Sequence, residues 1–427
     1  MPLSNPSHTT SVIDRRESSA RSYCRWFPHT LTRATGSLVY DETGREYLDF
    51  LAGAGALNYG HNHPALRESL LEYVAGDGIV QSLDLTTAAK REFLEEFEDT
   101  ILRPRSMKHR VQFTGPTGAN AVESALKLAR KVTGRTNVVA FTRGFHGCSL
   151  GALAATSASH FRSSSAASLH GVIRAPFDGY FGPDVDTADM LTAQLRDPSG
   201  GLDAPAAFLL ETVQGEGGLN TASKSWLRKI AALAHEVGAL LIVDDIQAEC
   251  GRTGTFFSTE DTGVTPDLIV LSKSLSGYGL PMSIVLISPE HDEWLPAEHN
   301  GTFRGNGMAM VTATAALRTF WRDDSLTNDV KRRSAVVRER LTAMSNRIPG
   351  SVVKGRGMFL GIDVVDPDLA SQVRRFSADH GLLIESCGPR DEVVKVLAPL
   401  TTTETQLRHG LDIIDQALGQ QAHSSAA

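Results

Sequence analysis

Residues 239–279 read ALLIVDDIQAECGRTGTFFSTEDTGVTPDLIVLSKSLSGYG, and this stretch decides the fold. It holds two short apolar runs, and each run ends at a charged side chain: Asp244 closes the first, and Lys273 follows the second. Neither run alternates with polar residues, which is typical of parallel strands that are covered on both faces. Because ligands bind beyond the carboxyl ends of the strands in such sheets, these two ends are the first candidates for a functional site.

Short apolar runs also occur on both sides of this stretch, and they alternate with segments of helical pattern. Apolar residues recur at helical spacing in 121–129 and in 227–234, between further apolar runs. This alternation predicts an α/β fold with a mostly parallel sheet and crossover helices. The predicted strands of the sheet are 110–115, 137–141, 206–213, 239–245, 267–272 and 282–288.

The two ends of the chain have a different pattern. Residues 38–50, LVYDETGREYLDF, predict a hairpin around Thr43 and Gly44, and the chain beyond 310 mixes strands with helices. We therefore expect a large domain and a smaller α+β domain that combines both ends. The expected bounds are 76–310 for the large domain, and 1–75 with 311–427 for the small one, with residues 1–20 flexible.

Composition and charge exclude several classes of protein. The 427 residues are 41% hydrophobic and 21% charged, which is typical of a globular chain that buries a core without disulfides. The 42 basic and 49 acidic residues are spread along the chain, so nucleic acid is not an expected partner. Four widely spaced cysteines indicate a reducing compartment, and the apolar runs are far shorter than the roughly 20 residues of a membrane span. We expect a cytoplasmic protein with no membrane partner.

Three features at predicted strand ends suggest chemistry. TGPTGAN (114–120) is a glycine-rich turn that opens a helix, where free backbone N–H groups favour a phosphate. GFHG (144–147) places an aromatic ring beside an imidazole. Lys273, directly after an apolar run, is a candidate amine nucleophile.

Acidic and histidine residues raise the question of a metal. Asp244, Asp245 and Glu249 are ligands for a divalent cation in one interpretation, and in the other a single carboxylate holds a proton on a heteroaromatic nitrogen. The pattern alone does not choose between them. His61 and His63 form a His-x-His pair with no evident third ligand, so we favour a structural turn there and expect no metal site.

In chain order, a phosphate cradle, an aromatic ring, an acid and a lysine are what a pyridoxal phosphate enzyme requires. The chain resembles the class III (subgroup II) aminotransferases of PLP fold type I, from about residue 30 to residue 415. The motifs that carry the resemblance are DFLAGAGALNYGHNHP (49–64), FTGPTGANAVESALKLAR (113–130), ETVQGEGG (211–218), DDIQAECGRTG (244–254), SKSLSGYGLP (272–281) and NGTFRGN (300–306).

The resemblance implies a role for each matching residue. Lys273 is expected to bind the cofactor, pyridoxal 5'-phosphate, covalently and to transfer the proton, while Asp244 pairs with the pyridine nitrogen. His146 and Asp245 match motif positions either as cofactor contacts or as structural supports. The other expected cofactor contacts are Gly118 and Ala119 to the phosphate, Phe145 stacked on the ring, Gln247 at the phenolic oxygen, and Thr302 on the phosphate of a neighbouring subunit. The expected substrate contacts are Glu211, Glu216 and Lys395.

Three positions depart from the family pattern. Cys148 stands where many relatives have an arginine that binds the substrate carboxylate. Lys395 replaces an arginine that pairs with the glutamate matching Glu216, and a lysine lacks the planar two-point grip of arginine. Glu249 stands where the motif has glycine.

The likeness is strongest to the branch that serves the ectoine pathway. It implies transamination that interconverts L-aspartate 4-semialdehyde plus L-glutamate with L-2,4-diaminobutyrate plus 2-oxoglutarate, in a homodimer or a dimer of dimers. The expected partners are therefore amino acid and oxo-acid substrates. Two alternatives stay open: a relative that aminates another aldehyde or ω-amino acid, and a PLP-fold scaffold without catalysis, against which Lys273 and Asp244 argue.

Overall fold

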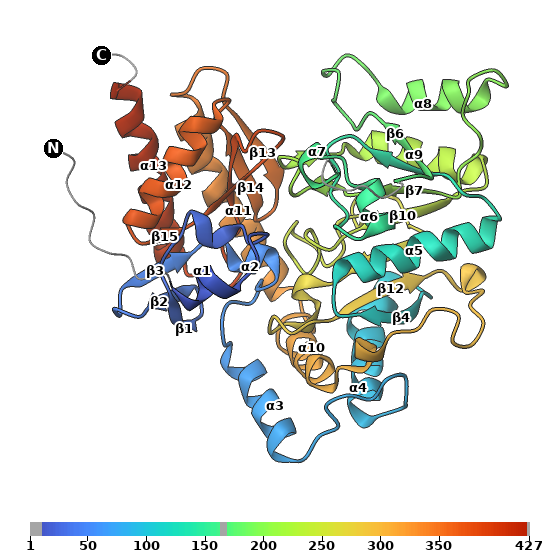
Figure 1. Ribbon diagram of the computed structural model, residues 1–427, viewed down its shortest axis with the longest axis horizontal. Helices are drawn as coiled ribbons and strands as arrows, with labels where there is room; N and C mark the ends of the chain where they lie inside the picture. Colours follow the sequence, from blue (N-terminus) through green and yellow to red (C-terminus); the bar gives the residue numbers. More distant parts are fainter. Residues whose placement is uncertain (1–10, 163–168, 425–427) are drawn as a thin grey trace.

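A seven-stranded sheet forms the centre of the larger part of the molecule. The computed structural model describes residues 11–162 and 169–424. Six of the seven strands run in one direction and β12 runs against them, in the order β4-β12-β11-β10-β7-β5-β6 across the sheet (Figure 1). The bounds are β4 Arg110–Gly115, β5 Val138–Phe141, β6 Val172–Ala175, β7 Ala207–Leu210, β10 Leu240–Asp244, β11 Leu268–Leu271 and β12 Ser283–Ile287. The predicted α/β fold with a mostly parallel sheet is confirmed.

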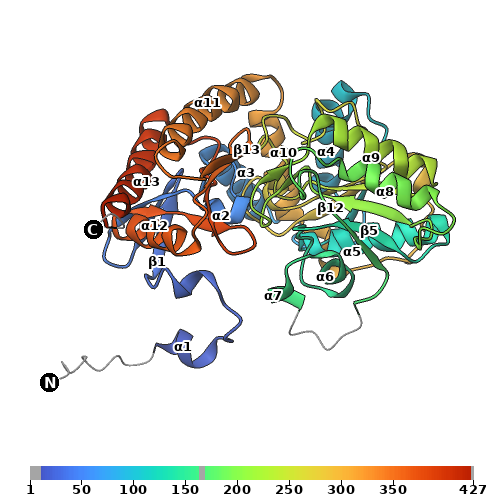
Figure 2. The same cartoon turned by 90° about the horizontal axis from the view of Figure 1, so that it is seen from above.

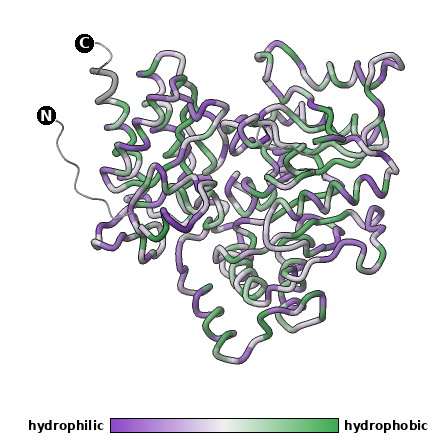
Figure 3. Tube along the Cα trace, in the orientation of Figure 1, coloured by the Kyte–Doolittle hydropathy of each residue, from purple (hydrophilic) through white to green (hydrophobic). Residues whose placement is uncertain are grey.

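Helices cover both faces of this sheet, which explains why its strands are apolar throughout. Along β10, Leu240 and Ile242 pack toward α5 (Gly118–Thr133), while Leu241 and Val243 pack on the opposite face. That second face is covered by α8 (Thr187–Arg196) and α9 (Lys224–Glu236). Figure 3 shows the hydrophobic residues gathered along these strands. Burial of both faces favours a continuous apolar run over an alternating one.

Two details of the sheet differ from the sequence prediction. The 282–288 run forms β12, which is antiparallel to both of its neighbours, β11 and β4, although its composition matches that of the parallel strands. The 206–213 run is split: β7 ends at Leu210, and Val213–Gln214 forms β8, which pairs with β9 (Asn220–Thr221). The split leaves Glu211 at a strand end, where it faces the site described below.

The smaller part combines both ends of the chain. The predicted hairpin is confirmed as β2 (Leu38–Asp41) and β3 (Glu46–Asp49), and β15 (Leu382–Leu383) extends this sheet next to β3. A second sheet of β13 (Val352–Arg356), β14 (Phe359–Asp363), β17 (Val393–Val396) and β16 (Glu385–Cys387) lies in the same part. Its helices are α11 (Ser325–Ser345), α12 (Pro367–Asp379) and α13 (Glu404–Ser424).

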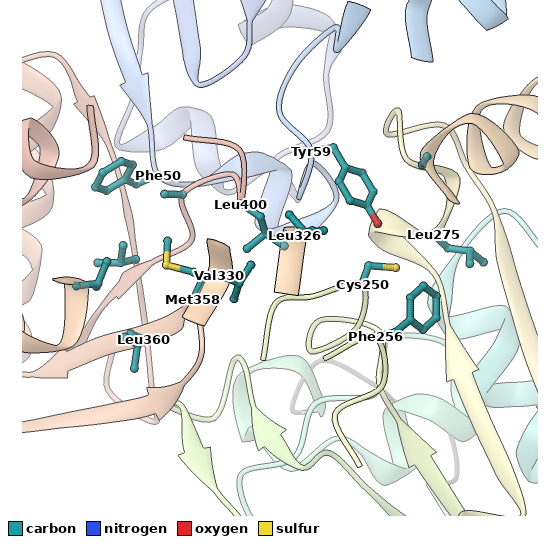
Figure 4. Close-up of a cluster of buried hydrophobic side chains, with 14 of the residues drawn as sticks. Phe50, Tyr59, Cys250, Phe256, Leu275, Leu326, Val330, Met358, Leu360 and Leu400 are labelled. Carbon is teal, nitrogen blue, oxygen red and sulfur yellow. The ribbon is translucent and has the colours of Figure 1, made fainter. Parts of the chain in front are cut away.

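One buried cluster joins the two parts. It includes Phe50 and Leu360 from the smaller part, and Tyr59, Phe256 and Leu275 from the side of the central sheet (Figure 4). Helices below the sheet in Figure 1 contribute to the same cluster: α3 (Pro64–Ala75), α4 (Ala88–Phe97) and α10 (Gly307–Phe320). The shared core fixes the smaller part against the ends of the strands.

The N-terminal residues bury little. Within the segment predicted to be flexible, Val12–Arg16 form α1, which has no buried residue and stands away from the body in Figure 2. Residues 1–10 lie outside the described residues. The remaining short helices are α2 (Ala52–Gly55), α6 (Leu150–Ala155) and α7 (Ser159–Arg162). None of the helices in the described ranges is long and apolar enough to cross a bilayer.

Candidate active site

A cavity of about 170 Å³ lies at the carboxyl ends of the parallel strands. It brings together nine of the residues singled out in the sequence: Gly118, Ala119, Phe145, His146, Glu211, Glu216, Asp244, Gln247 and Lys273. They come from six separate segments of the chain, and each segment follows a strand or opens a helix. This is the position in which open α/β sheets bind their ligands.

Asp244 and His146 form the buried polar pair of this cavity. Asp244 is the last residue of β10, and its Oδ2 lies 2.8 Å from Nδ1 of His146. Both side chains are almost fully buried, with 5% and 3% of their surface exposed. The His146 backbone N–H donates to Oγ1 of Thr156 at 2.9 Å. His146 therefore orients the carboxylate and leaves Asp244 as the fixed acceptor at the floor of the cavity.

Asp245 points away from this cavity. Its Oδ2 accepts from the backbone N–H of Ser258 at 2.9 Å, and it is not among the residues lining the cavity. Burial raises the pKa of Asp245 to about 6. No group of three potential ligands that could hold a metal occurs in the described part of the chain. Of the two interpretations of this acidic motif, the geometry favours the single carboxylate, Asp244.

Lys273 follows β11 in a strained backbone conformation. Its φ is +23°, in the left-handed region that side chains other than glycine rarely adopt, and such strain persists where the surroundings enforce it. Its Nζ donates to the carbonyl oxygen of Ala54 at 2.8 Å. Burial lowers the pKa of the Lys273 amine, while the Glu216 carboxylate opposes the shift. A lowered pKa increases the fraction of neutral amine, which is the nucleophilic form.

Glu211 holds the loop that carries Phe145. Its two oxygens accept from the backbone N–H groups of Phe145, at 2.9 Å, and of Gly215, at 3.1 Å. Burial raises the pKa of Glu211 to about 7, although the nearby His146 opposes the shift. Both oxygens are thus engaged with the protein, which favours a supporting role over the substrate contact expected from the sequence.

Glu216 lies at the rim of the cavity beside Lys395. Its Oε1 accepts from Nζ of Lys395 at 3.0 Å and from Nε2 of Gln247 at 3.3 Å. Lys395 is fully buried on β17 and also lies 2.7 Å from Oε1 of Glu385. Burial opposes the charge on Glu216, but Lys395 and Lys273 prevail and hold the pKa of Glu216 at about 2.

Glu385 is the site residue that sequence reasoning missed. It lies on β16, and β16 pairs with β17 so that Glu385 is directly opposite Lys395. The hydroxyl of Tyr23 also donates to Glu385, over 3.4 Å. The pairing of β16 with β17 brings these side chains together, and the sequence around Glu385 does not indicate that pairing. The cation at Lys395 therefore serves two carboxylates, not one.

A larger cavity of about 660 Å³ continues outward from the first and shares Phe145 and Glu216 with it. We refer to it as the mouth cavity. Its lining includes four arginines, Arg143, Arg162, Arg174 and Arg390, and two acidic residues, Glu216 and Asp391. Cys148 is exposed and lines neither cavity. The excess of positive charge at the entrance favours anionic ligands.

Three other singled-out residues, Thr302, His61 and His63, also lie outside both cavities. Thr302 is exposed, beside a separate hollow that Leu83 and Asp84 also line. His61 lies 2.7 Å from Oδ2 of Asp49, and the ring of His63 packs edge to face on Phe320. The two histidines thus have different partners, in agreement with a structural turn.

Comparisons with known proteins agree with this geometry. The model of the family "Aminotransferase class-III" matches residues 19–418, and the chain belongs to that family. It is therefore an enzyme that transfers amino groups, and its cofactor is pyridoxal 5'-phosphate.

Its relatives point to one branch of the family. The chain is 53% identical over 409 residues to a diaminobutyrate–2-oxoglutarate transaminase of Vibrio cholerae, covering 95% of this chain and 99% of that protein. It is 51% identical over 410 residues to the enzyme of the same name from Bordetella parapertussis, covering 95% and 94%. Among solved structures, an ornithine aminotransferase from Toxoplasma gondii, with partial occupancy of PLP at its active site, superposes with a TM-score of 0.83 at 27% identity, covering 96% of this chain and 94% of that one.

The residues of the cavity fit this cofactor. Helix α5 begins at Gly118, and the first N–H groups of a helix have no partner within the helix, so its start suits a phosphate. A Cβ at Gly118 would lie 2.6 Å from Cδ1 of Ile246, so a larger residue there would displace the Ile246 side chain, which also lines the cavity. The anchored carboxylate of Asp244 suits the protonated ring nitrogen, and the Lys273 amine suits the carbonyl carbon. A site for each reactive part of the cofactor is therefore present in one cavity.

Proposed function

We propose that this enzyme transfers the amino group of L-glutamate to L-aspartate 4-semialdehyde and forms L-2,4-diaminobutyrate and 2-oxoglutarate. The observation that carries the proposal is the Glu216–Lys395 ion pair, in which Glu216 lines the Lys273 cavity and Lys395 is buried behind it. It offers a carboxylate for the α-ammonium group of diaminobutyrate and a cation for the α-carboxylate of glutamate. Relatives at 51% and 53% identity carry the corresponding transaminase name, which favours this substrate over another aldehyde.

The residues of the cavity have separate tasks in this reaction. When bound, pyridoxal phosphate supplies an electron sink for the negative charge that develops on the substrate carbon. Asp244 holds the proton at the ring nitrogen, and His146 keeps its carboxylate in place. The Nζ atom of Lys273 removes the proton from the substrate carbon and delivers it again. Gln247 and Phe145 orient the ring, and the arginines of the mouth cavity attract the carboxylates of both substrates.

To test this proposal, the rates of the glutamate half-reaction and the diaminobutyrate half-reaction are measured separately in Lys395→Met. Without Lys395, the Glu216 carboxylate still attracts the α-ammonium group of diaminobutyrate, but it repels the α-carboxylate of glutamate. We expect the glutamate half-reaction to slow by about ten- to a hundredfold and the diaminobutyrate half-reaction to change much less. Single-turnover spectra with each amino donor measure this directly, and wild type should react poorly with 4-aminobutyrate.

Lys354→Met is the matched control for this substitution. Lys354 lies on β13 in the same sheet, and its ion-pair partner within 4.0 Å among the described residues is Asp363. It should leave the ratio of the two half-reactions unchanged. Equal losses in both half-reactions of Lys395→Met argue against the proposed use of the pair, and failure of wild type to react with diaminobutyrate argues against the proposed substrate.

We also propose that the enzyme works in the cytoplasm as a homodimer or a dimer of dimers. Exposed apolar side chains lie next to Thr302: Ile79, Val80, Leu83, Leu85 and Phe303 are between 47% and 67% exposed. Backbone hydrogen bonds from Ser82 to Gly305 and from Gly307 to Val80 tie the two segments together. An exposed apolar patch of this kind marks an interface, and a second copy on it brings Thr302 toward the neighbouring site. Four unpaired cysteines support the reducing compartment.

Complementation tests the shared site. Lys273→Ala chains and Thr302→Asp chains are each expected to be inactive, the second because a carboxylate repels the cofactor phosphate. Heterodimers formed by mixing should regain activity, because one of their two sites combines an intact Lys273 with an intact Thr302. Remixing Lys273→Ala with itself is the control. Full activity from a monomer verified by light scattering contradicts the proposal.

A further inference from the structure

Glu249 is a buried carboxylic acid directly behind the reactive lysine. Only 1% of its surface is exposed, and it lies in the turn that follows β10. Its backbone N–H donates to the carbonyl oxygen of Asp245 at 2.8 Å, and its own carbonyl accepts from Nδ2 of Asn58 at 3.2 Å. These bonds fix the main chain of Glu249, so the direction of its side chain is determined by the fold.

The carboxyl group of Glu249 contacts the residue before Lys273. Its Oε1 accepts from the backbone N–H of Ser272 at 3.2 Å, whereas its Oε2 is buried without a hydrogen-bond partner. Ser272 itself lines the cavity, and its hydroxyl donates to the carbonyl oxygen of Met282 at 2.9 Å. On the other side of Lys273, the hydroxyl of Ser274 donates to the carbonyl oxygen of Gly55 at 2.7 Å.

Lys273 is thus the strained residue between two anchored ones. A side chain other than glycine at a φ of +23° persists only when its neighbours are held in place. Ser272 directly precedes Lys273 in the chain, and its backbone N–H donates to Glu249. If this acceptor is lost, the Ser272 N–H group stays buried without a hydrogen bond, which costs free energy. The Ser272–Lys273 backbone then relaxes to lower that cost.

The surroundings of Glu249 keep its carboxyl neutral. The titratable groups that face it are Asp245 and Asp244 at the end of β10, Lys273, and the side chains of Tyr59 and Cys250. None of the ion pairs within 4.0 Å in the described ranges involves Glu249. Figure 4 shows Tyr59 and Cys250 within the apolar cluster on this side of the sheet. Burial, reinforced by the Asp245 carboxylate, raises the pKa of Glu249 well above its usual range.

We propose that Glu249 is a positioning residue that holds the Ser272 amide and thereby fixes the backbone from which Lys273 enters the cavity. A neutral acid does this without placing a further negative charge beside Asp244, the carboxylate that holds the ring proton. The inference rests on the role of Lys273 in the proposed function, but it does not depend on which aldehyde is the substrate. Glu249 stands at a position of the motif where glycine is expected, so the proposed positioning role belongs to this chain.

The experiment compares Glu249→Gln with Glu249→Leu in the holoenzyme. Glutamine retains the acceptor and cannot ionise, whereas leucine fills the space and offers no acceptor. The readouts are the pH midpoint of the visible absorption of the Lys273-bound cofactor and the rate at which apoenzyme forms during dialysis. We expect Glu249→Gln to match wild type in both, and Glu249→Leu to shift the midpoint and to lose cofactor about tenfold faster.

Stability against pH gives a second, independent readout on Glu249→Gln. Folding raises the pKa of this carboxyl group, so the folded state holds its proton more tightly than the unfolded chain does. The stabilisation from that proton decreases as the pH rises above the pKa of the group in the unfolded chain. Wild type should therefore lose stability relative to Glu249→Gln as the pH rises above about 4.5, the ordinary pKa of a glutamate carboxyl. Glu96→Gln is the matched control: Glu96 is also buried, but it pairs with Arg318 and Arg322 on α10 and beyond, away from the cavity. It should leave the spectral midpoint unchanged.

Two outcomes overturn the proposal. One is a Glu249→Leu enzyme that keeps the wild-type midpoint and cofactor retention, because the Ser272 amide then does not need its acceptor. The other is a Glu249→Gln enzyme that loses cofactor about tenfold faster than wild type, because charge is then required, or that gains no stability over wild type at high pH, because the buried carboxyl is then not kept neutral. Both results are measured against wild type, so they decide the matter even if Glu249→Leu does not fold. Borohydride trapping on Lys273 in wild type shows separately whether the underlying role of the lysine holds.

Discussion

Lys273→Ala is expected to lower the rate of transamination by about 10⁴-fold or more, since in the proposed function the same amine bonds to the cofactor and moves the proton. Lys273 is the lysine in the lining of the cavity, and Lys395 is fully buried in ion pairs with Glu216 and Glu385. Single-turnover absorbance measurements with either amino donor give the rate. Borohydride reduction of wild type, followed by peptide mapping, should place the label on Lys273.

The fold of the Lys273→Ala protein is expected to survive. The substitution removes a partly buried amine and retains a small side chain at a strained φ of +23°. Its melting temperature as apoprotein should therefore stay close to that of wild-type apoprotein. Label on a different lysine in wild type, or turnover by Lys273→Ala at rates near those of wild type, is incompatible with the assigned role.

Asp244→Asn is expected to slow both half-reactions by about 10²- to 10³-fold, because a neutral amide no longer stabilises the protonated ring nitrogen. The shape of the side chain and its position beside His146 are preserved, so the change isolates the charge. Rates of the two half-reactions, measured with saturating cofactor, test this. The absorption spectrum of the bound cofactor should change as well, since it reports protonation of the ring.

The adjacent Asp245 provides the matched control for that experiment. Asp245→Asn removes a carboxyl group one residue further on, equally buried, whose Oδ2 accepts from the Ser258 amide outside the cavity. We expect its half-reactions to stay within about tenfold of wild type. If Asp245→Asn is as slow as Asp244→Asn, or if Asp244→Asn reacts as fast as wild type, the carboxylate at the end of β10 does not have the role proposed here.

Much of the site could be predicted because its residues follow the strands directly. The end of an apolar run is visible in a sequence, and the ends of parallel strands meet at one edge of a sheet. Asp244 and Lys273 were found in this way, and the lining of the cavity includes both. The edge strand β6 was missed because VIRA is short, contains Arg174 and is only half-buried over most of its length.

Other features depend on pairings that leave no local trace. The run at 283–287 is apolar whether its neighbours are parallel or antiparallel, so its reversed direction could not be predicted. Glu385 reaches Lys395 only because β16 and β17 are adjacent. The sequence predicts a substrate contact for Glu211, but its two oxygens accept from backbone N–H groups, a pairing that depends on where β7 ends.

The antiparallel strand β12 also determines when the site can form during synthesis on the ribosome. β4, which leads into the start of α5 where we expect the cofactor phosphate, has β12 as its neighbour in the sheet. Thr114 on β4 and Ser283 on β12 are 169 residues apart and joined by a 2.9 Å hydrogen bond. Contacts of such long sequence separation form slowly and late. We therefore expect the nascent chain to have no anchored β4 until about two thirds of it has emerged, and capture of the cofactor to follow, rather than guide, assembly of the sheet.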